Sequence, residues 1–332
     1  MRESRSIEEW KRVGGLGTVD GRTPDDVFVV CASFEDRASA TVECLSDGYH
    51  ARLGIIYASE EFRNETSQAG SRVQLRLDAI RGILERRCDR VVTAQGSWMS
   101  PASQLSALRS VLPAGNDFLP VRAITIDTTT FTRETLLIAA AVLRQRFRDA
   151  ALRVTYVQPT AYGEWLSRGF QDTRNVLGFP GVQHASRPTV LTVLSGFEPE
   201  RTLRIIEEYE PSLLLLGFGT AEPPHPFHTR NISDQQAVML ARQDHQRFDF
   251  PAYDIGGCAQ TIETLLSPYW DGCNVVVAPM STKLSTLSTF VVACAHSELQ
   301  ITYCVPGEYN VEGYTRGADR LLTDEITCVV DQ

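Results

Sequence analysis

Two clusters of hydroxyl side chains follow apolar segments at widely separated places in the sequence. One is IDTTTFT at 126–132, and the other is APMSTKL at 278–284, where a lysine accompanies the hydroxyls. A helix that begins directly after a strand offers unpaired backbone N–H groups, and the positive end of its dipole attracts anions. One hydroxyl is sufficient to cap such a helix. The additional hydroxyls and Lys283 therefore indicate contact with an anionic group such as a phosphate.

A second pair of similar segments carries opposite charges side by side. SFEDR at 33–37 resembles GFEPER at 196–201, and each follows an apolar run. A carboxylate repels a phosphate unless a cation neutralises it, but it can accept a hydrogen bond from a base amine or a ribose hydroxyl. We expect each arginine to pair with the glutamate of its own segment.

A third pair of similar segments lies further along the chain. YVQPTAYGEWLSRG at 156–169 resembles YCVPGEYNVEGYTRG at 303–317, with one insertion. Tyr162 and Tyr309 could stack on a base, and the arginines could reach a phosphate. Alternatively, the tyrosines pack the edge of a domain and the arginines bind carbonyl groups.

The elements that must position these residues alternate along the chain. From Val27 onward, short β-rich runs such as VFVVCAS and LGIIYAS are separated by helical segments such as SRVQLRLDAIRGILERR. This alternation is typical of βαβ units and a parallel sheet. The Gly- and Pro-rich stretch at 178–189 interrupts the pattern, which then begins again.

The sequence therefore predicts an α/β protein with two Rossmann-like, doubly wound parallel-sheet domains related by internal duplication. We expect an N-terminal helix and linker at 1–24, a first domain at 25–180 and a second domain at 188–332. The three similar pairs occur in the same order in both halves, which favours duplication. The alternative is that two doubly wound domains share strand, turn and helix patterns without common origin.

In open α/β sheets, ligands bind outside the carboxyl ends of the strands, at the point where strand order reverses. We expect the first strand and the hydroxyl-bearing strand of each half to flank that point. The residues that we then expect to contact a ligand are Phe34, Glu35, Arg37, Asp127, Thr128, Thr129, Thr130 and Tyr162 in the first half, and Phe197, Glu198, Arg201, Ser281, Thr282, Lys283 and Tyr309 in the second. Phe131 aligns with Lys283, and Asp127 aligns with Pro279, so the two halves would differ in charge.

Composition narrows the class of partner. A net charge of −9 argues against binding to duplex DNA, which requires a basic surface. No apolar run approaches the roughly 20 residues that span a bilayer, and the N-terminus lacks a signal-peptide pattern, so we expect a cytoplasmic protein with no membrane contact. The eight cysteines form no C-x-x-C pair, and no nucleotide-loop motif occurs. We expect reduced thiols, no metal site and no cofactor.

The MSTKLSTL segment and the paired turns that contain Phe-Glu resemble the CARF domains of CRISPR-linked sensors. Two such units in one chain resemble the SAVED sensors of bacterial antiphage systems, including those of the CBASS type. The resemblance covers residues 25–180 and 188–328. It implies a nucleotide-type ligand, such as a cyclic or linear oligonucleotide, that lies across the seam between two Rossmann-like units. By this resemblance the ligand contacts are Ser281, Thr282, Lys283, Thr129 and Thr130, and a separate effector protein acts in prokaryotic defence.

Two other functions fit the same residues. The chain could be a phosphodiesterase or ring-nuclease-like enzyme that cleaves such a ligand, with Thr282 and Lys283 orienting the phosphate or with Glu35 and Asp127 holding Mg²⁺. Alternatively, the duplicated sheets could serve only as a non-catalytic scaffold for a separate effector chain. Turnover of the ligand would distinguish an enzyme from a sensor.

Overall fold

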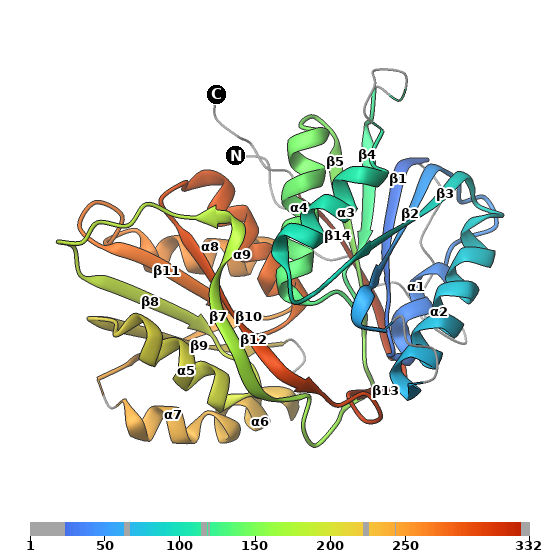
Figure 1. The fold of residues 1–332 in the computed structure, drawn as a ribbon. Helices are drawn as coiled ribbons and strands as arrows, with labels where there is room; N and C mark the ends of the chain where they lie inside the picture. Colours follow the sequence, from blue (N-terminus) through green and yellow to red (C-terminus); the bar gives the residue numbers. More distant parts are fainter. Residues whose placement is uncertain are drawn as a thin grey trace. The chain divides into compact units, whose positions relative to one another are not determined.

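A computed structural model describes residues 24–62, 67–113, 118, 120–221, 226–242 and 244–326. The N-terminal helix and linker predicted for 1–24 lie outside the described residues, apart from Pro24. The described chain divides into two compact units, coloured along the chain in Figure 1. Unit 1 contains the residues up to Gly163 together with those that follow from Val311, and unit 2 consists of Glu164–Asn310.

Unit 1 is built around a six-stranded sheet with the order β3-β2-β1-β4-β5-β14. Its strands are β1 (Asp25–Ala32), β2 (Ala51–Ser59), β3 (Cys88–Gly96), β4 (Ala123–Asp127), β5 (Ala151–Gln158) and β14 (Arg320–Ile326). The first five run parallel, and β14 pairs antiparallel with β5. A small two-stranded sheet joins β6 (Ala161–Tyr162) to β13 (Thr315–Arg316).

The helices of unit 1 cover both faces of this sheet. They are α1 (Ala40–Glu43), α2 (Gln68–Leu84), α3 (Pro101–Val111) and α4 (Arg133–Arg146), with the 3-10 turns η1 (Asp36–Ser39) and η2 (Glu60–Phe62). Figure 1 shows α1 and α2 on one face and α3 and α4 on the other. Hydroxyl caps fix the helix starts: Ser67, Ser100 and Thr132 accept hydrogen bonds from Gly70, Ser103 and Thr135 N–H groups.

Unit 2 is built around a second six-stranded sheet, with the order β10-β9-β8-β11-β12-β7. Its strands are β7 (Ser167–Pro180), β8 (Thr189–Leu194), β9 (Leu213–Thr220), β10 (Gln246–Pro251), β11 (Asn274–Pro279) and β12 (Gln300–Tyr309). Its helices are α5 (Pro199–Tyr209), α6 (Pro226–Asp234), α7 (Gln236–Ala241), α8 (Ile255–Leu266) and α9 (Lys283–Ala295). Among the six strands of this sheet, only β7 runs antiparallel, and it pairs with β12.

The predicted fold class is confirmed. Each unit has five parallel strands in the Rossmann-type order, with the first strand at the centre beside the fourth, and an antiparallel strand at the edge. Strand β1 pairs with β4, and β8 pairs with β11, so the first strand and the hydroxyl-bearing strand are neighbours in both units as expected. Internal duplication stays a prediction.

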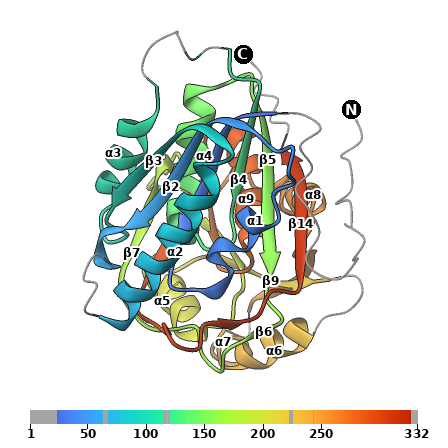
Figure 2. The same ribbon diagram turned by 90° about the vertical axis from the view of Figure 1, so that its right-hand side faces the viewer.

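The structure divides the chain differently from the predicted domains at 25–180 and 188–332. Strand β7 pairs with β12 and belongs to unit 2, whereas β14 pairs with β5 and belongs to unit 1 (Figure 2 shows β14 beside β5). In sequence, β7 follows β5, the fifth parallel strand of unit 1, but it completes the sheet of unit 2. Likewise, β14 follows β12, the fifth parallel strand of unit 2, but it completes the sheet of unit 1. A local sequence pattern does not specify the strand with which a segment pairs. The exchange of β7 and β14 between the sheets therefore explains why the observed boundary between the units differs from the predicted domain boundary.

Candidate functional site

A buried ion pair joins Glu35 and Arg37 at the end of β1. Arg37 donates from Nη2 to Glu35 Oε2 at 2.6 Å, and both side chains are almost completely buried. Arg37 also donates from Nη1 to the Val157 carbonyl oxygen at 2.5 Å. Burial alone disfavours the charged guanidinium, but the Glu35 carboxylate raises the pKa of Arg37 above its usual value. The predicted local pairing is confirmed, and it ties the end of β1 to β5.

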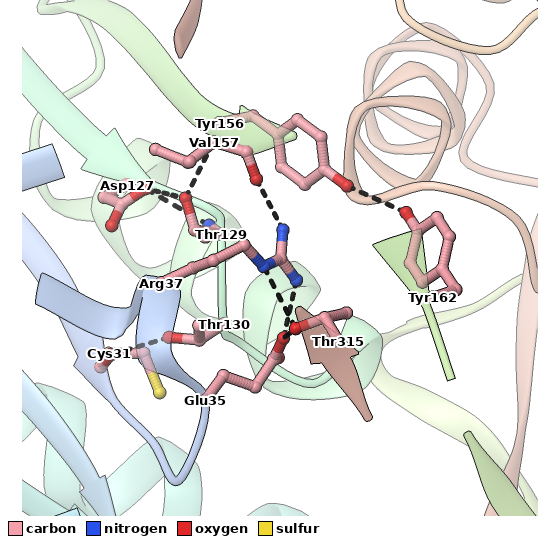
Figure 3. Close-up of polar contacts among 10 residues, drawn as sticks. All are labelled: Cys31, Glu35, Arg37, Asp127, Thr129, Thr130, Tyr156, Val157, Tyr162 and Thr315. Atoms are coloured by element: carbon pink, nitrogen blue, oxygen red, sulfur yellow. Dashed lines mark hydrogen bonds and ion pairs between the residues drawn. The ribbon is translucent and has the colours of Figure 1, made fainter. Parts of the chain in front are cut away.

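Residues of β5, β6 and β13 complete this cluster, which Figure 3 shows. Thr315, on β13, donates its hydroxyl hydrogen to Glu35 Oε2 at 2.6 Å. The Tyr156 ring lies 5.9 Å from the Arg37 guanidinium, and the Tyr156 and Tyr162 hydroxyls lie 3.2 Å apart. Tyr162 therefore lies at the edge of a structural cluster.

Unit 2 contains a corresponding cluster. Arg201 donates from Nε to the Cys304 carbonyl oxygen at 2.9 Å, and its Nη1 lies 3.7 Å from Glu198 Oε1. Ser167 donates to the same Glu198 oxygen at 2.6 Å, as Thr315 does to Glu35 in unit 1. Two tyrosines repeat the pattern: the Tyr303 ring lies 5.2 Å from Arg201, and its hydroxyl lies 3.5 Å from that of Tyr309.

The first hydroxyl cluster is used within unit 1. Thr128 donates to the Thr155 carbonyl oxygen at 2.9 Å, and Thr130 donates to the Cys31 carbonyl oxygen at 2.7 Å. Thr129 donates to Asp127 Oδ1 at 2.5 Å and accepts from the Val157 N–H group at 3.0 Å. These threonines are buried, and their hydrogen bonds join β1, β4 and β5. The cap of α4 is Thr132, a residue that was not among the predicted site residues.

Asp127 is the most enclosed carboxylate of the cluster, with none of its surface exposed. Its Oδ1 accepts from the Thr129 N–H group at 3.2 Å and from the Thr129 hydroxyl. Removal from water is the main influence on this group, and it raises the pKa of Asp127 to about 6, although the bonds from Thr129 oppose the shift. Where Lys283 would align, Phe131 is buried and stacks on Tyr57 at 5.8 Å.

The second hydroxyl cluster lies between β11 and α9 in unit 2. Thr282 is the N-cap of the 13-residue helix α9, and its hydroxyl accepts from the Ser285 N–H group at 3.0 Å. It also donates to the Ala252 carbonyl oxygen at 2.5 Å, which joins this turn to the chain after β10. Lys283 is the first residue of α9 and is 9% exposed, while Ser281 is half-buried. This turn places a cation and hydroxyls at the positive end of a helix, next to the central strand β8.

The turn after β8 brings Glu198 into the same corner. A Cβ atom at Gly196 would overlap the Met280 carbonyl oxygen and would lie 3.3 Å from Glu198 Oε2. Only glycine therefore permits the close approach of this turn to the end of β11. Glu198 is 9% exposed, and its Oε2 is a buried oxygen with no hydrogen-bond partner.

Two side-chain amides outside the predicted site residues hold this turn in place. Asn231 donates to the Ser195 carbonyl oxygen at 2.8 Å, and Gln235 donates to the Gly196 carbonyl oxygen at 2.8 Å. Both side chains are buried. Their segment, NISDQQ, is mostly polar, and polar residues four positions apart are also typical of a solvent-exposed helix face.

The aromatic residues of the two predicted turns pack against other rings. Phe34 is buried and makes edge contacts with Phe62 at 5.6 Å and Tyr314 at 5.9 Å. Phe197 is half-buried, lies 6.1 Å from Phe227, and has the Arg230 guanidinium 4.5 Å above its ring. Both contribute packing at the ends of their central strands.

Within the described residues, no group of three or more His, Cys, Asp and Glu side chains is arranged to hold a metal ion. Of the two carboxylates considered for Mg²⁺, Glu35 pairs with Arg37, and Asp127 accepts from Thr129 through Oδ1, while its buried Oδ2 has no hydrogen-bond partner. The cysteines in the described part of the chain are free thiols. No described helix is long and apolar enough to cross a membrane.

Comparisons with known proteins give little further information. No protein-family model matches the chain, and a search of curated proteins gives no match. One similar solved structure is the crystal structure of an N-terminal ketoreductase from macrolactin assembly line, with 9% sequence identity and a TM-score of 0.20. The alignment covers 83% of this chain and 63% of the ketoreductase chain, so this chain spans less than two thirds of that protein's length.

Proposed function

We propose that the protein is a sensor that binds a nucleotide-type anion in unit 2, at the turn between β11 and α9. The observation that carries the proposal is the position of Lys283. It is the first residue of a 13-residue helix that follows β11, and β11 pairs with the central strand β8. Lys283 thus adds a positive charge to a helix N-terminus at the reversal of strand order, where doubly wound sheets bind their ligands.

The proposal assigns different roles to the two units. In unit 1 the equivalent threonines bond to backbone carbonyl groups and to Asp127, and Phe131 occupies the position of the lysine. A buried carboxylate at this place opposes an anion. We therefore assign the ligand to unit 2 and a structural role to the corresponding residues of unit 1.

The resemblance of MSTKLSTL to the CARF and SAVED sensors supports the wider biological role. In this proposal the ligand is a nucleotide, such as a cyclic oligonucleotide, and its binding regulates a separate effector protein in a prokaryotic defence system. In this proposal the protein acts in the cytoplasm and binds neither duplex DNA nor a membrane.

Thermal unfolding of the wild-type protein and of Lys283→Met tests this function. The probes are mononucleotides, linear dinucleotides and cyclic oligoadenylates, with mass spectrometry of each probe after incubation. We expect a nucleotide to raise the melting temperature of the wild type and to have a much smaller effect on the variant, since methionine preserves the aliphatic stem but removes the charge.

Lys283→Arg serves as the matched control, because it retains the charge and should retain most of the stabilisation. An intact probe after incubation supports a sensor, and a cleaved probe would identify an enzyme instead. If Lys283→Met responds to the nucleotides as the wild type does, the proposed site is wrong.

A further inference from the structure

Glu198 has two carboxylate oxygens in different situations. Oε1 accepts from the Ser167 hydroxyl at 2.6 Å and faces Arg201 Nη1 at 3.7 Å. Oε2 is also buried but has no hydrogen-bond partner. A buried oxygen without a donor costs about 1–3 kcal/mol, and more when it is charged, so in a native protein it requires an explanation such as strain, a bound water or ion, or a functional role.

The unpartnered oxygen lies next to the proposed site. A Cβ at Gly196 would approach Glu198 Oε2 to 3.3 Å and would overlap the Met280 carbonyl oxygen, so both oxygens lie beside the same glycine. Met280 is followed directly by Ser281, Thr282 and Lys283. Glu198 Oε2 is thus positioned independently of α9, on the turn after the neighbouring strand β8.

Unit 1 provides a comparison within the same chain. Glu35 Oε2 accepts from both Arg37 Nη2 and the Thr315 hydroxyl, each at 2.6 Å. In the described part of the chain, Glu35 has no oxygen that is both buried and unpartnered, whereas Glu198 has one. Asp127 Oδ2 in unit 1 is also buried and unpartnered, so the comparison holds for the two equivalent glutamates alone: of these, only the one in the unit with Lys283 has such an oxygen.

We infer that Glu198 Oε2 accepts a hydrogen bond from a hydroxyl or amino group of the ligand, so that the site takes a nucleoside phosphate and discriminates against inorganic phosphate. This inference rests on the proposed function and specifies the chemistry of its ligand. The anionic part of the ligand meets the N-terminus of α9 and Lys283, and its neutral donor meets Glu198. Arg201 compensates the charge of Glu198, which reduces the repulsion between this carboxylate and a phosphate.

The donor could be a ribose hydroxyl or a base amino group, and a set of probes separates them. We would titrate AMP, 2′-deoxyAMP, IMP and inorganic phosphate into the full-length wild type, Glu198→Gln, Glu35→Gln and Lys283→Met by calorimetry. We expect Glu198→Gln to bind AMP at least about tenfold more weakly, because the amide in one orientation places a donor against the donor of the ligand. Inorganic phosphate should not distinguish this variant from the wild type.

Glu35→Gln is the matched control, since it alters the equivalent ion pair in unit 1 and should bind AMP as the wild type does. If the ribose hydroxyl is the donor, the wild type favours AMP over 2′-deoxyAMP, and Glu198→Gln loses this preference. If the amino group is the donor, the wild type favours AMP over IMP, and the glutamine variant reverses or abolishes this preference.

The outcomes that overturn the inference are distinct from those that overturn the function. Nucleotide binding that Lys283→Met weakens but Glu198→Gln leaves unchanged overturns the inference alone. Stabilisation by Mg²⁺ without nucleotide, lost in Glu198→Gln, would assign the oxygen to a cation and also overturn it. No binding of any nucleotide to the wild type overturns both.

Discussion

The hydroxyl group of Thr315 donates a hydrogen bond to Glu35 at 2.6 Å, although 280 positions separate the two residues in the sequence. Both belong to unit 1, which includes the chain from Val311 onward. The chain therefore returns from unit 2 to satisfy a buried charge next to the first strand. Ser167 has the same relationship to Glu198 in unit 2.

We predict that Thr315→Val destabilises the protein by about 2 kcal/mol, because hydrogen bonds to charged groups contribute about 1.5–3 kcal/mol and valine leaves the carboxylate with one donor fewer. Urea unfolding followed by circular dichroism measures the change. Ser167→Ala should have a similar effect in unit 2. Thr229→Val, at an exposed position of α6, should change the stability by less than about 0.5 kcal/mol. An equal effect of Thr315→Val and Thr229→Val would contradict the structural role of this hydroxyl.

Asp127 should make the stability depend on pH. Its folded pKa of about 6 lies above the ordinary value of 3.8, so the folded state holds its proton more tightly than the unfolded state does. The contribution of Asp127 is therefore most favourable below about pH 4, and it is lost as the pH rises to about 6. A shift of about two units corresponds to about 3 kcal/mol.

Asp127→Asn isolates this effect, because asparagine has the same shape and no titration. We expect the free energy of unfolding of the wild type, relative to that of the variant, to fall by about 2.5 kcal/mol between pH 4 and pH 7, since the unfolded carboxyl group is already partly ionised at pH 4. Guanidinium unfolding at several pH values measures it. A difference that stays constant across this range would show that Asp127 ionises at the same pH in both states.

The two helix caps offer a paired test of site and structure. Thr282 caps α9 and Thr132 caps α4, and each hydroxyl accepts from the N–H group three residues later. Thr282→Val and Thr132→Val should each destabilise the protein by about 1 kcal/mol, measured by thermal unfolding. Only Thr282→Val should also weaken nucleotide binding, and Thr282→Ser should restore both properties. Equal weakening by the two valine variants would mean that binding responds to stability alone.

Gly196 should not tolerate a side chain. The added Cβ of Gly196→Ala would overlap the Met280 carbonyl oxygen, which belongs to the backbone and has little room to move. We expect a loss of more than about 2 kcal/mol in chemical unfolding, since strain and overpacking in a buried site typically cost 1–3 kcal/mol. Gly48→Ala, where no atom lies within 4 Å of the new Cβ, should be nearly neutral. Wild-type stability of Gly196→Ala would show that the two turns are further apart than described.

The sequence was sufficient to predict those features that depend on local patterns. Apolar runs predicted most of the parallel strands and helices, although not β10 and α8, and the Rossmann-type order predicted that β8 and β11 would be neighbours. The pairing of Glu35 with Arg37 was predictable because the residues are close in sequence.

Features that depend on distant partners were not predictable. The threonines at 128–130 looked like excess hydroxyls because their acceptors, such as the carbonyl groups of Cys31 and Thr155, belong to strands elsewhere in the chain. Strand β7 was not predicted, because most of its side chains are exposed or half-buried and it lacks the continuous apolar run of a central strand. Asn231 and Gln235 gave no signal because their role depends on the turn that they reach.

The exchange of edge strands has a consequence for the order in which the units are completed during synthesis. All strands of the unit 2 sheet lie within residues 167–309, so this sheet is complete while unit 1 still lacks β14 at 320–326. Until β14 emerges from the ribosome, β5 is an unpaired edge and Glu35 lacks the Thr315 hydroxyl. Open strand edges promote aggregation, so unit 1 is the more vulnerable half of the nascent chain, although its first residues are made earlier.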